Sequence, residues 1–112
     1  MKVYLDDVRT PPDGWFLTRT APETVEVLEN NKVTHLSLDH DLGEEPGVGN
    51  GNDVLIWIEE QVALNGYHPP VIDIHSSNPA ARLKMNAAVA SINRLARNNL
   101  SGKKNTKHRR RY

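Results

Sequence analysis

The chain has 112 residues, the size of one small domain, and 38% of them are hydrophobic. It contains no cysteine, which excludes a disulfide framework and a thiolate metal site. No apolar run approaches the roughly 20 residues that a membrane-spanning helix needs, and acidic residues come too early at the N-terminus for a signal peptide. We therefore expect a soluble cytoplasmic protein.

The formal net charge of zero hides an uneven distribution of charge. Residues 103–112 hold six of the 14 Lys and Arg residues and no acid, which leaves 8 basic against 14 acidic residues before them. The basic segment has no apolar periodicity, so we expect one domain over residues 1–101 and a disordered tail over residues 102–112. Such a tail could simply aid solubility, or could make weak contact with nucleic acid or with the acidic body.

Short apolar runs alternate along the chain with apolar residues at helical spacing. The expected elements, in chain order, are strands over residues 2–5 and 15–20, a helix over 21–31, a strand over 33–38, a helix over 53–65, a strand over 71–74 and a helix from 79 onward. This alternation predicts an α/β fold with a mostly parallel, four-stranded sheet and helices on both faces, which is a three-layer sandwich.

Polar residues mark the ends of the expected helices. Asn52 or Asp53 is the expected N-cap of the second helix, and Gly66 is expected to end it. Asn78 followed by Pro79 is typical of the N-cap and first residue of a helix. These residues predict where the second and third helices begin and where the second helix ends.

Three of the expected strands end in polar clusters. Residues 6–7 are two aspartates, residues 39–41 read Asp-His-Asp, and residues 75–78 read His-Ser-Ser-Asn. Parallel strands place their carboxyl ends at one edge of a sheet, where ligands of such folds bind. We therefore expect four carboxylates and two imidazoles, distant in sequence, to share one crevice.

Four carboxylates so close together repel one another unless a cation neutralises them. Oxygen ligands suit Mg²⁺, Mn²⁺ or Ca²⁺, whereas zinc sites draw more on His and Cys. Mg²⁺ commonly bridges a few carboxylates to a phosphate, so the expected cofactor is Mg²⁺ or Mn²⁺. Arg9 is placed to make a bidentate contact with a phosphate, and the helix that begins after Asn78 turns free N–H groups toward the same edge. The expected metal ligands are Asp6, Asp7, Asp39 and Asp41.

Several of these side chains also have ordinary structural explanations. Asp6 and Asp7 could cap the turn before the prolines, and Asn78 is fully explained as a helix cap. His40 could be exposed and inert, because adjacent residues of a strand point to opposite faces. A nucleophilic Ser76 has no base in the sequence beyond its neighbour.

Four motifs together resemble a known family. The segments "YLDDVRTPP", "LSLDHDLG", "GNDVLIWI" and "IHSSNP" are similar, in this order and spacing, to the cyclic-phosphate processing receiver-like domain, a relative of the response-regulator receiver fold. The resemblance covers about residues 3–95. It implies a trimmed receiver-like or flavodoxin-like α/β fold that processes a cyclic phosphate.

The resemblance also implies roles for individual residues. Asp6 and Asp7 match the acidic pair that holds Mg²⁺ in receivers, and Asp39 matches the aspartate that accepts a phosphoryl group there. His75 and Ser76 fall where receivers place a Thr or Ser. No further strand carries the lysine with which receivers sense the phosphoryl group, so classical signalling is not expected.

Our leading hypothesis is a metal-dependent phosphoesterase acting on a cyclic phosphate of a nucleotide or RNA end. Its expected catalytic residues are Asp39, His75 and His40, either histidine transferring a proton, and its substrate-binding residues are Arg9, Ser76 and Asn78. The alternative is a non-catalytic receiver-like module that binds a phosphorylated ligand or partner protein, in which Asp39 could itself be phosphorylated. A third reading is an RNA-binding protein without catalysis.

Overall fold

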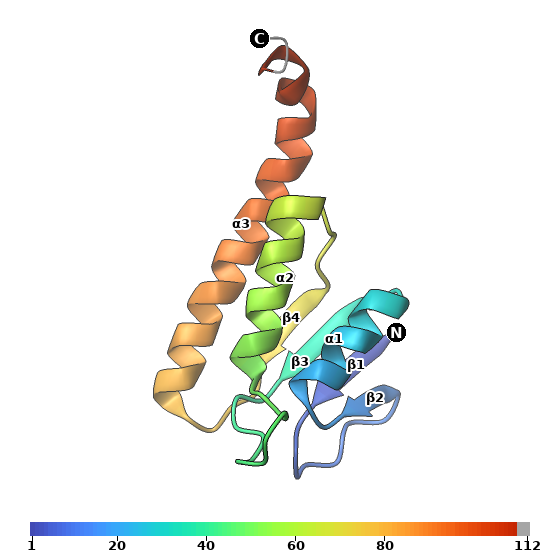
Figure 1. The fold of residues 1–112 in the computed structure, drawn as a ribbon, viewed down its shortest axis with the longest axis vertical. Helices are drawn as coiled ribbons and strands as arrows, with labels where there is room; N and C mark the ends of the chain where they lie inside the picture. The colour runs from blue at the N-terminus through green and yellow to red at the C-terminus, as the bar shows by residue number, and fades with distance from the viewer. Residues whose placement is uncertain (110–112) are drawn as a thin grey trace.

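The structure is a computed structural model that describes the backbone of residues 1–109 and the side chains of residues 1–100 (Figure 1). Every element expected from the sequence is present. In chain order the elements are β1 (Lys2–Leu5), β2 (Trp15–Thr18), α1 (Ala21–Asn30), β3 (His35–Leu38), α2 (Gly51–Asn65), β4 (Val71–Ile74) and α3 (Pro79–Arg109).

The four strands form one parallel sheet in the order β2-β1-β3-β4. The α/β class, the four strands and the trimmed receiver-like architecture are thus confirmed, and the sheet is entirely parallel. From β1 the chain steps to β2 on one side and then crosses back to β3 on the other. This reversal creates a topological switch point between the carboxyl ends of β1 and β3, where ligands of open α/β sheets bind.

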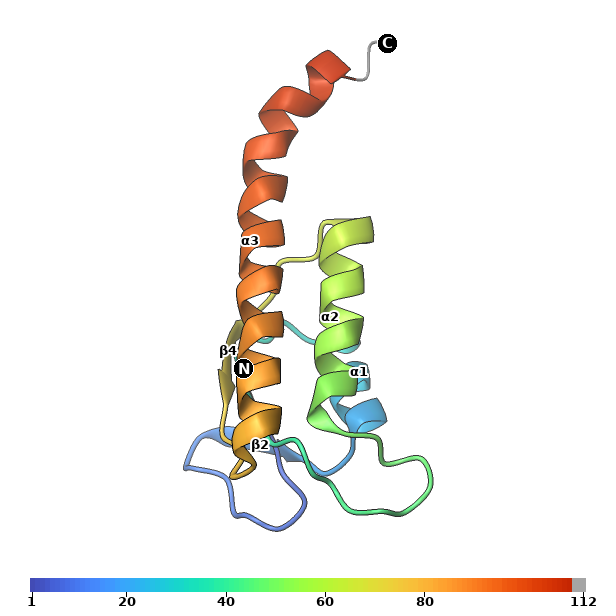
Figure 2. The same cartoon turned by 90° about the vertical axis from the view of Figure 1, so that its left-hand side faces the viewer.

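The hydrophobic core lies on one face of the sheet. Alternate strand residues, including Val3, Leu5, Leu36 and Leu38, point into it and are fully buried. Helix residues join the same cluster: Leu28 from α1, Val54, Leu55, Ile58 and Val62 from α2, and Met85, Val89 and Ile92 from α3. One contiguous core therefore joins the sheet to all three helices, and Figures 1 and 2 show α1 and α2 on the same side of it.

The opposite face of the sheet differs from the expectation of a three-layer sandwich. Its strand residues Lys2, Val71 and Asp73 are exposed, and Tyr4 and Trp15 are half-buried. Right-handed crossovers put connections that run in opposite directions on opposite faces. The one connection that belongs on this second face joins β1 to β2 through residues 6–14 and contains no helix. Within residues 1–109 the fold is therefore two layers deep.

The helix caps agree with the sequence in two of three cases. Gly66 ends α2 in the left-handed conformation, with φ of 66°. The side chain of Asn78 accepts a hydrogen bond from the backbone N–H of Ala81, three residues into α3. The N-cap of α2 is Asn50, which forms a capping box with Asp53, so the expected cap at Asn52 or Asp53 is wrong.

The C-terminal helix is the longest element of the fold. Its backbone continues past the end of α2 (Figure 2) and reaches Arg109, so it overlaps the segment expected to be a tail. The basic side chains of that segment and residues 110–112 lie outside the described residues, and the disorder and function of the tail stay predictions. In the described part of the chain, no helix is long and apolar enough to cross a bilayer.

Candidate functional site

Asp6 directly follows β1, and its carboxylate is fully buried. Its Oδ1 atom accepts hydrogen bonds from the backbone N–H groups of Val8 at 2.9 Å and Arg9 at 2.8 Å. Its Oδ2 atom lies 3.0 Å from Nε2 of His75. Burial raises the pKa of this carboxyl, but the hydrogen bonds from Arg9, Val8 and His75 outweigh burial and bring the pKa below its ordinary value. Asp6 is therefore a fixed anion at neutral pH.

Asp39 occupies the equivalent position after β3. It is half-buried, and Oδ1 accepts a hydrogen bond from the backbone N–H of His40 at 2.8 Å. Burial raises the pKa of the Asp39 carboxyl, and the negative charges of Asp6 and Asp7 add to the rise, which the hydrogen bond from His40 only partly offsets. The ionised form of Asp39 is therefore disfavoured in the site without a cation.

His75 completes the group from the tip of β4. One potential ligand atom each from Asp6, Asp39 and His75 lie within 4.8 Å of one another, and we call these three residues the carboxylate cluster. The Nδ1 atom of His75 lies 2.7 Å from the hydroxyl of Ser37. The imidazole also stacks on the ring of Tyr4, with centroids 4.3 Å apart and planes inclined by 3°. Both ring nitrogens of His75 are therefore engaged by the protein.

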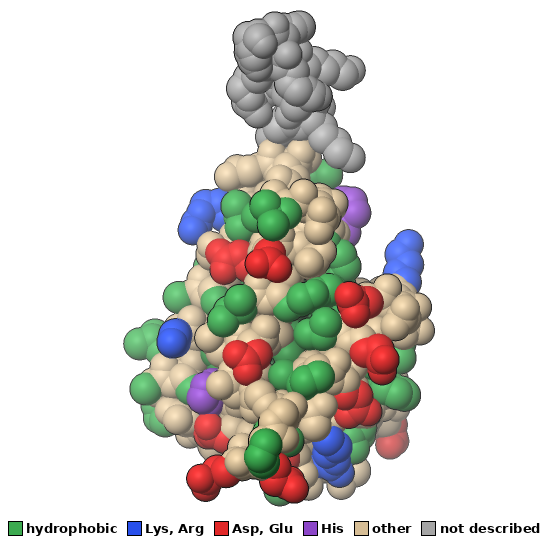
Figure 3. All heavy atoms as spheres, in the orientation of Figure 1, with side chains coloured by type: hydrophobic (Ala, Val, Ile, Leu, Met, Phe, Trp, Pro, Cys, Tyr) green, Lys and Arg blue, Asp and Glu red, His purple; other side chains and the backbone are tan. Residues whose placement is uncertain are grey.

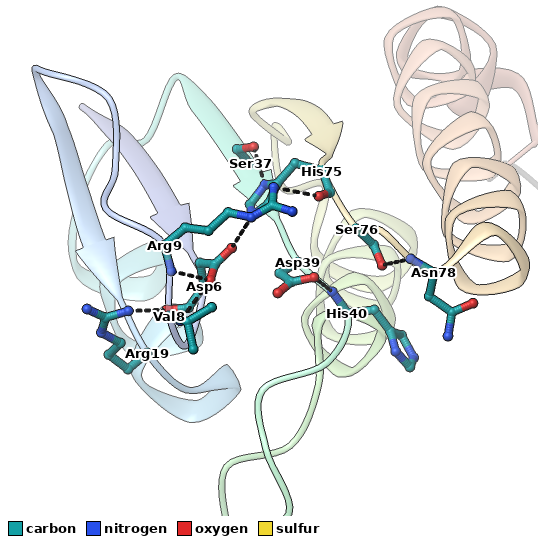
Figure 4. Close-up of polar contacts among 10 residues, drawn as sticks. All are labelled: Asp6, Val8, Arg9, Arg19, Ser37, Asp39, His40, His75, Ser76 and Asn78. Atoms are coloured by element: carbon teal, nitrogen blue, oxygen red, sulfur yellow. Dashed lines mark hydrogen bonds and ion pairs between the residues drawn. The ribbon is translucent and has the colours of Figure 1, made fainter.

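Arg9 lies over the contact between Asp6 and His75 (Figure 4). Its Nη1 atom donates a hydrogen bond to the main-chain carbonyl of His75 at 3.3 Å, and Nε lies 3.9 Å from Oδ2 of Asp6. Half of its side-chain surface remains exposed. The guanidinium is thus oriented by the protein and still accessible to a ligand.

Three more of the predicted site residues, Asp7, His40 and Asp41, line an adjoining pocket of about 480 Å³. We call it the loop pocket; it is lined by Asp7, His40, Asp41, Leu42, Gly43, Glu44, Gly49 and Asn50. Nδ1 of His40 lies 2.7 Å from Oδ1 of Asp41. Figure 4 shows the His40 ring turned away from Asp6. The sequence predicted one crevice for these groups, and the structure divides them between the carboxylate cluster and the adjoining loop pocket.

Ser76 and Asn78 lie between β4 and α3, and their side chains accept hydrogen bonds from the backbone at the entry to α3. The hydroxyl of Ser76 is almost fully buried and accepts a hydrogen bond from the backbone N–H of Asn78 at 3.1 Å. Figure 4 shows both residues on the far side of Asp39 from Asp6. Their role in substrate binding stays a prediction.

The surface around the site is acidic. Figure 3 shows several Asp and Glu side chains, with Lys or Arg beside them, at the lower end of the molecule, where the loop after β3 lies in Figure 1. Glu44 and Asp41 belong to the lining of the loop pocket there. An anionic ligand that approaches this end requires compensating positive charge, from Arg9 or from a cation.

A comparison with protein families agrees with the geometry. The family model described as the cyclic-phosphate processing receiver domain matches residues 1–91, which include all four strands and every residue of the carboxylate cluster. The chain belongs to this family. Comparisons with curated proteins and with solved structures gave no significant match.

The structure of this receiver domain adds contacts that sequence reasoning missed. Ser37 holds His75, and Nη1 of Arg19 donates a hydrogen bond at 3.0 Å to the carbonyl of Asp6. Nη1 of Arg82 donates at 3.1 Å to the carbonyl of Ser76. One signal was present for Ser37, which interrupts an apolar strand at a position that faces away from the core. The two arginines had no distinguishing sequence pattern.

Proposed function

We propose that this receiver domain is a metal-dependent phosphoesterase that opens a cyclic phosphate on a nucleotide or an RNA end. The family supports involvement in cyclic-phosphate processing. The single observation that carries the proposal is the carboxylate cluster, in which Asp6, Asp39 and His75 converge within 4.8 Å at the switch point of the sheet. Residues separated by up to 69 positions in the chain meet there.

The donor set of the cluster fits Mg²⁺ or Mn²⁺. Oδ1 of Asp6 is saturated by two backbone N–H groups, whereas Oδ2 and the carboxylate of Asp39 each retain lone pairs. Burial raises the pKa of Asp39 most, and the negative charges of Asp6 and Asp7 add to the rise; a divalent cation would stabilise the ionised carboxylate against both. Asp6 and Asp39 would hold the ion, with Asp7 and Asp41 as further carboxylates at the neighbouring pocket. A bound ion would supply an acidified water and neutralise charge that develops on the phosphate.

Arg9 is the residue we assign to phosphate binding. Its exposed guanidinium is held by one N–H on the carbonyl of His75, and this leaves other N–H groups for phosphate oxygens. The ion pair with Asp6 is long, at 3.9 Å, so it does not saturate the guanidinium. Arg9 would therefore orient the substrate and offset the acidic surroundings.

His40 is the histidine better placed to move a proton. Asp41 engages its Nδ1 atom at 2.7 Å, which leaves Nε2 for exchange with a ligand in the loop pocket. Hydrolysis adds one water: its oxygen bonds to phosphorus, one ester bond of the phosphate ring breaks, and the leaving oxygen takes a proton. A histidine held by a carboxylate on one ring nitrogen is a common general acid for such a leaving oxygen.

The test is phosphorus NMR of the purified chain with a panel of cyclic phosphates, including 2′,3′-cyclic nucleotides and an ADP-ribose cyclic phosphate. We expect one cyclic resonance to convert to a monoester with Mg²⁺ or Mn²⁺, and conversion to stop with EDTA or in Asp39→Asn. Asp73→Asn, the same change on the exposed face of β4, is the matched control and should retain activity. Turnover by Asp39→Asn at the wild-type rate would contradict the proposal that Asp39 holds a catalytic metal ion.

Binding without conversion would favour the alternative function. If a resonance shifts or broadens with metal but no product forms, the site binds phosphate without cutting it. The chain would then be a receiver-like module for a phosphorylated ligand or partner. Intact mass after incubation with acetyl phosphate would show whether Asp39 takes up a phosphoryl group.

A further inference from the structure

Ser37 has no role in the function proposed so far, yet it contacts the site directly. It lies on the open face of β3, paired in register with Tyr4 of β1 and Asp73 of β4. Only 7% of its surface is exposed. Its hydroxyl lies 2.7 Å from Nδ1 of His75, whose Nε2 lies 3.0 Å from Oδ2 of Asp6. A continuous chain of polar contacts thus runs from the sheet face to the buried carboxylate (Figure 4).

The direction of these hydrogen bonds follows from the chemistry of the three groups. An ionised carboxylate only accepts hydrogen bonds, so Nε2 of His75 carries the proton and donates to Asp6. When the imidazole is neutral, its other nitrogen is an acceptor, and the hydroxyl of Ser37 then donates to Nδ1. Among the described side chains, Ser37 is the only one that hydrogen-bonds to Nδ1 of His75.

The surroundings restrict the ring to this arrangement. Tyr4 stacks flat against one face of the imidazole, and the backbone N–H of His75 donates to the carbonyl of Leu38 at 2.9 Å. Rotation of the ring by 180° would exchange its nitrogens and carbons and would lose both polar contacts. The imidazole is therefore held in plane by Tyr4 and fixed about its axis by Ser37 and Asp6.

We propose that Ser37 is a positioning residue of the site: its hydroxyl holds His75 as the Nε2–H tautomer, and His75 in turn holds the Asp6 carboxylate toward Asp39. The inference rests on the proposed function only for the metal-binding role of Asp6. Removal of a residue that hydrogen-bonds directly to a metal ligand, as His75 does to Asp6, typically changes metal affinity 10- to 100-fold. Ser37 lies one contact further out, so we expect its removal to fall at the lower end of this range. The two site histidines then have separate tasks, since His75 orients a carboxylate and His40 exchanges protons.

The test combines NMR and metal binding on the full chain. Long-range ¹H–¹⁵N spectra report which ring nitrogen of His75 is protonated, and the amide signals of Val8 and Arg9 report the position of Asp6, to which both donate. Affinity for Mn²⁺ alone is measured by electron paramagnetic resonance. In Ser37→Ala we expect His75 to lose the pure Nε2–H pattern, both amide signals to shift, and Mn²⁺ affinity to fall about 10-fold.

Two further variants keep the test specific. Ser37→Thr retains the hydroxyl and should restore all three readouts. Thr34→Ala is the matched control, because it removes a hydroxyl 3.0 Å from Nδ1 of another histidine, His35, at the opposite end of the sheet. It should change none of them.

Two results would overturn the inference: an unchanged His75 tautomer in Ser37→Ala, or a changed tautomer with the Val8 and Arg9 signals and Mn²⁺ affinity as in the wild type. If the wild-type chain binds no Mn²⁺, the proposed function fails instead. The ring and amide signals then still decide whether Ser37 positions His75 and Asp6.

Discussion

Gly51, the first residue of α2, packs its backbone directly on the main-chain carbonyl of Asp39. A β-carbon at position 51 would overlap that oxygen and would lie 2.8 Å from the terminal carbon of Met85. The backbone N–H of Gly51 also donates to the carbonyl of His40 at 3.1 Å. The start of α2 is thus fixed against the tip of β3 at a spot that has no room for a side chain.

Replacement of Gly51 by alanine should therefore destabilise the fold and displace Asp39. Overpacking of this kind typically costs about 1–3 kcal/mol, and here one of the overlapping atoms is backbone, which cannot move aside. Urea unfolding measures the change. Asn52→Ala, one residue further along the same helix turn, is the control and should stay within about 0.5 kcal/mol of the wild type. Equal midpoints for Gly51→Ala and the wild type would contradict the packing described.

Asp39→Asn should stabilise the metal-free protein while removing its response to metal. The asparagine oxygen can still accept the hydrogen bond from His40, and the variant lacks a carboxylate whose charge is disfavoured by burial and by the nearby Asp6 and Asp7. Relief of such strain at functional sites commonly yields about 0.5–2 kcal/mol. Thermal melts with and without Mg²⁺ measure both effects, and a variant less stable than the metal-free wild type would refute the first.

The stability gain of Asp39→Asn should depend on pH in a defined direction. The folded-state pKa of Asp39 is raised above its ordinary 3.8, so its charged form weakens the fold and its neutral form does not. The advantage of the asparagine variant is therefore full at neutral pH and shrinks as pH falls through the raised pKa of Asp39. Unfolding free energies of both proteins between pH 7 and pH 4 check this, and a constant difference would contradict it.

Asp6→Asn should have the opposite effect on stability. The new amide would present N–H groups to the Nε2–H of His75, or to Val8 and Arg9, and leave a buried donor unpaired at a cost of about 1–3 kcal/mol. Because the folded-state pKa of Asp6 is lowered, the stability it contributes is present above its ordinary 3.8 and is lost as pH falls through the folded value. A urea series at pH 7 measures the loss, which should exceed that of Asp7→Asn.

His40→Gln should lower turnover without loss of metal. Removal of a general acid typically costs 10²- to 10⁴-fold in kcat, whereas Mn²⁺ affinity should stay near that of the wild type because His40 lies outside the carboxylate cluster. The phosphorus NMR assay and Mn²⁺ titration measure the two quantities. His35→Gln, at the opposite end of β3, is the matched control. If His40→Gln turned over substrate at the wild-type rate, His40 would not be the general acid, and His75 would become the candidate for proton transfer.

The sequence predicted the strand tips well because parallel pairing brings them to one edge regardless of detail. Asp6, Asp39 and His75 each follow a short apolar strand, and the strand order alone places them together. The two layers of the fold were harder to foresee, since an alternating pattern of strands and helices does not say which face each helix covers. No helix covers the second face of the sheet because the β1–β2 connection, which lies on that face, contains no helix. The face on which this connection lies follows from the strand order, which the sequence does not give.

The details of the site depended on side-chain directions that no spacing encodes. His40 adjoins two aspartates in sequence, yet its ring pairs with Asp41 and leaves Asp39 to accept the backbone N–H. In the sequence, Ser37 is only a polar residue within an apolar strand. Its role becomes visible in the structure, where His75 at the end of β4 lies beside it. The cap of α2 was misplaced because Asn50, Asn52 and Asp53 are all good cap residues, and the close contact at Gly51 decides among them.

One face of the sheet is packed in the core and the other has no covering layer, so alternate residues of each strand tolerate substitution to different degrees. A saturation mutagenesis scan scored by folding should show a period of two along these four-residue strands. Positions 3, 5, 36 and 38 would accept little beyond aliphatic residues, whereas positions 2, 71 and 73 would tolerate most changes. Tyr4 and Ser37 share the open face, yet they would be permissive for folding and restrictive for activity, so the two scans would diverge there.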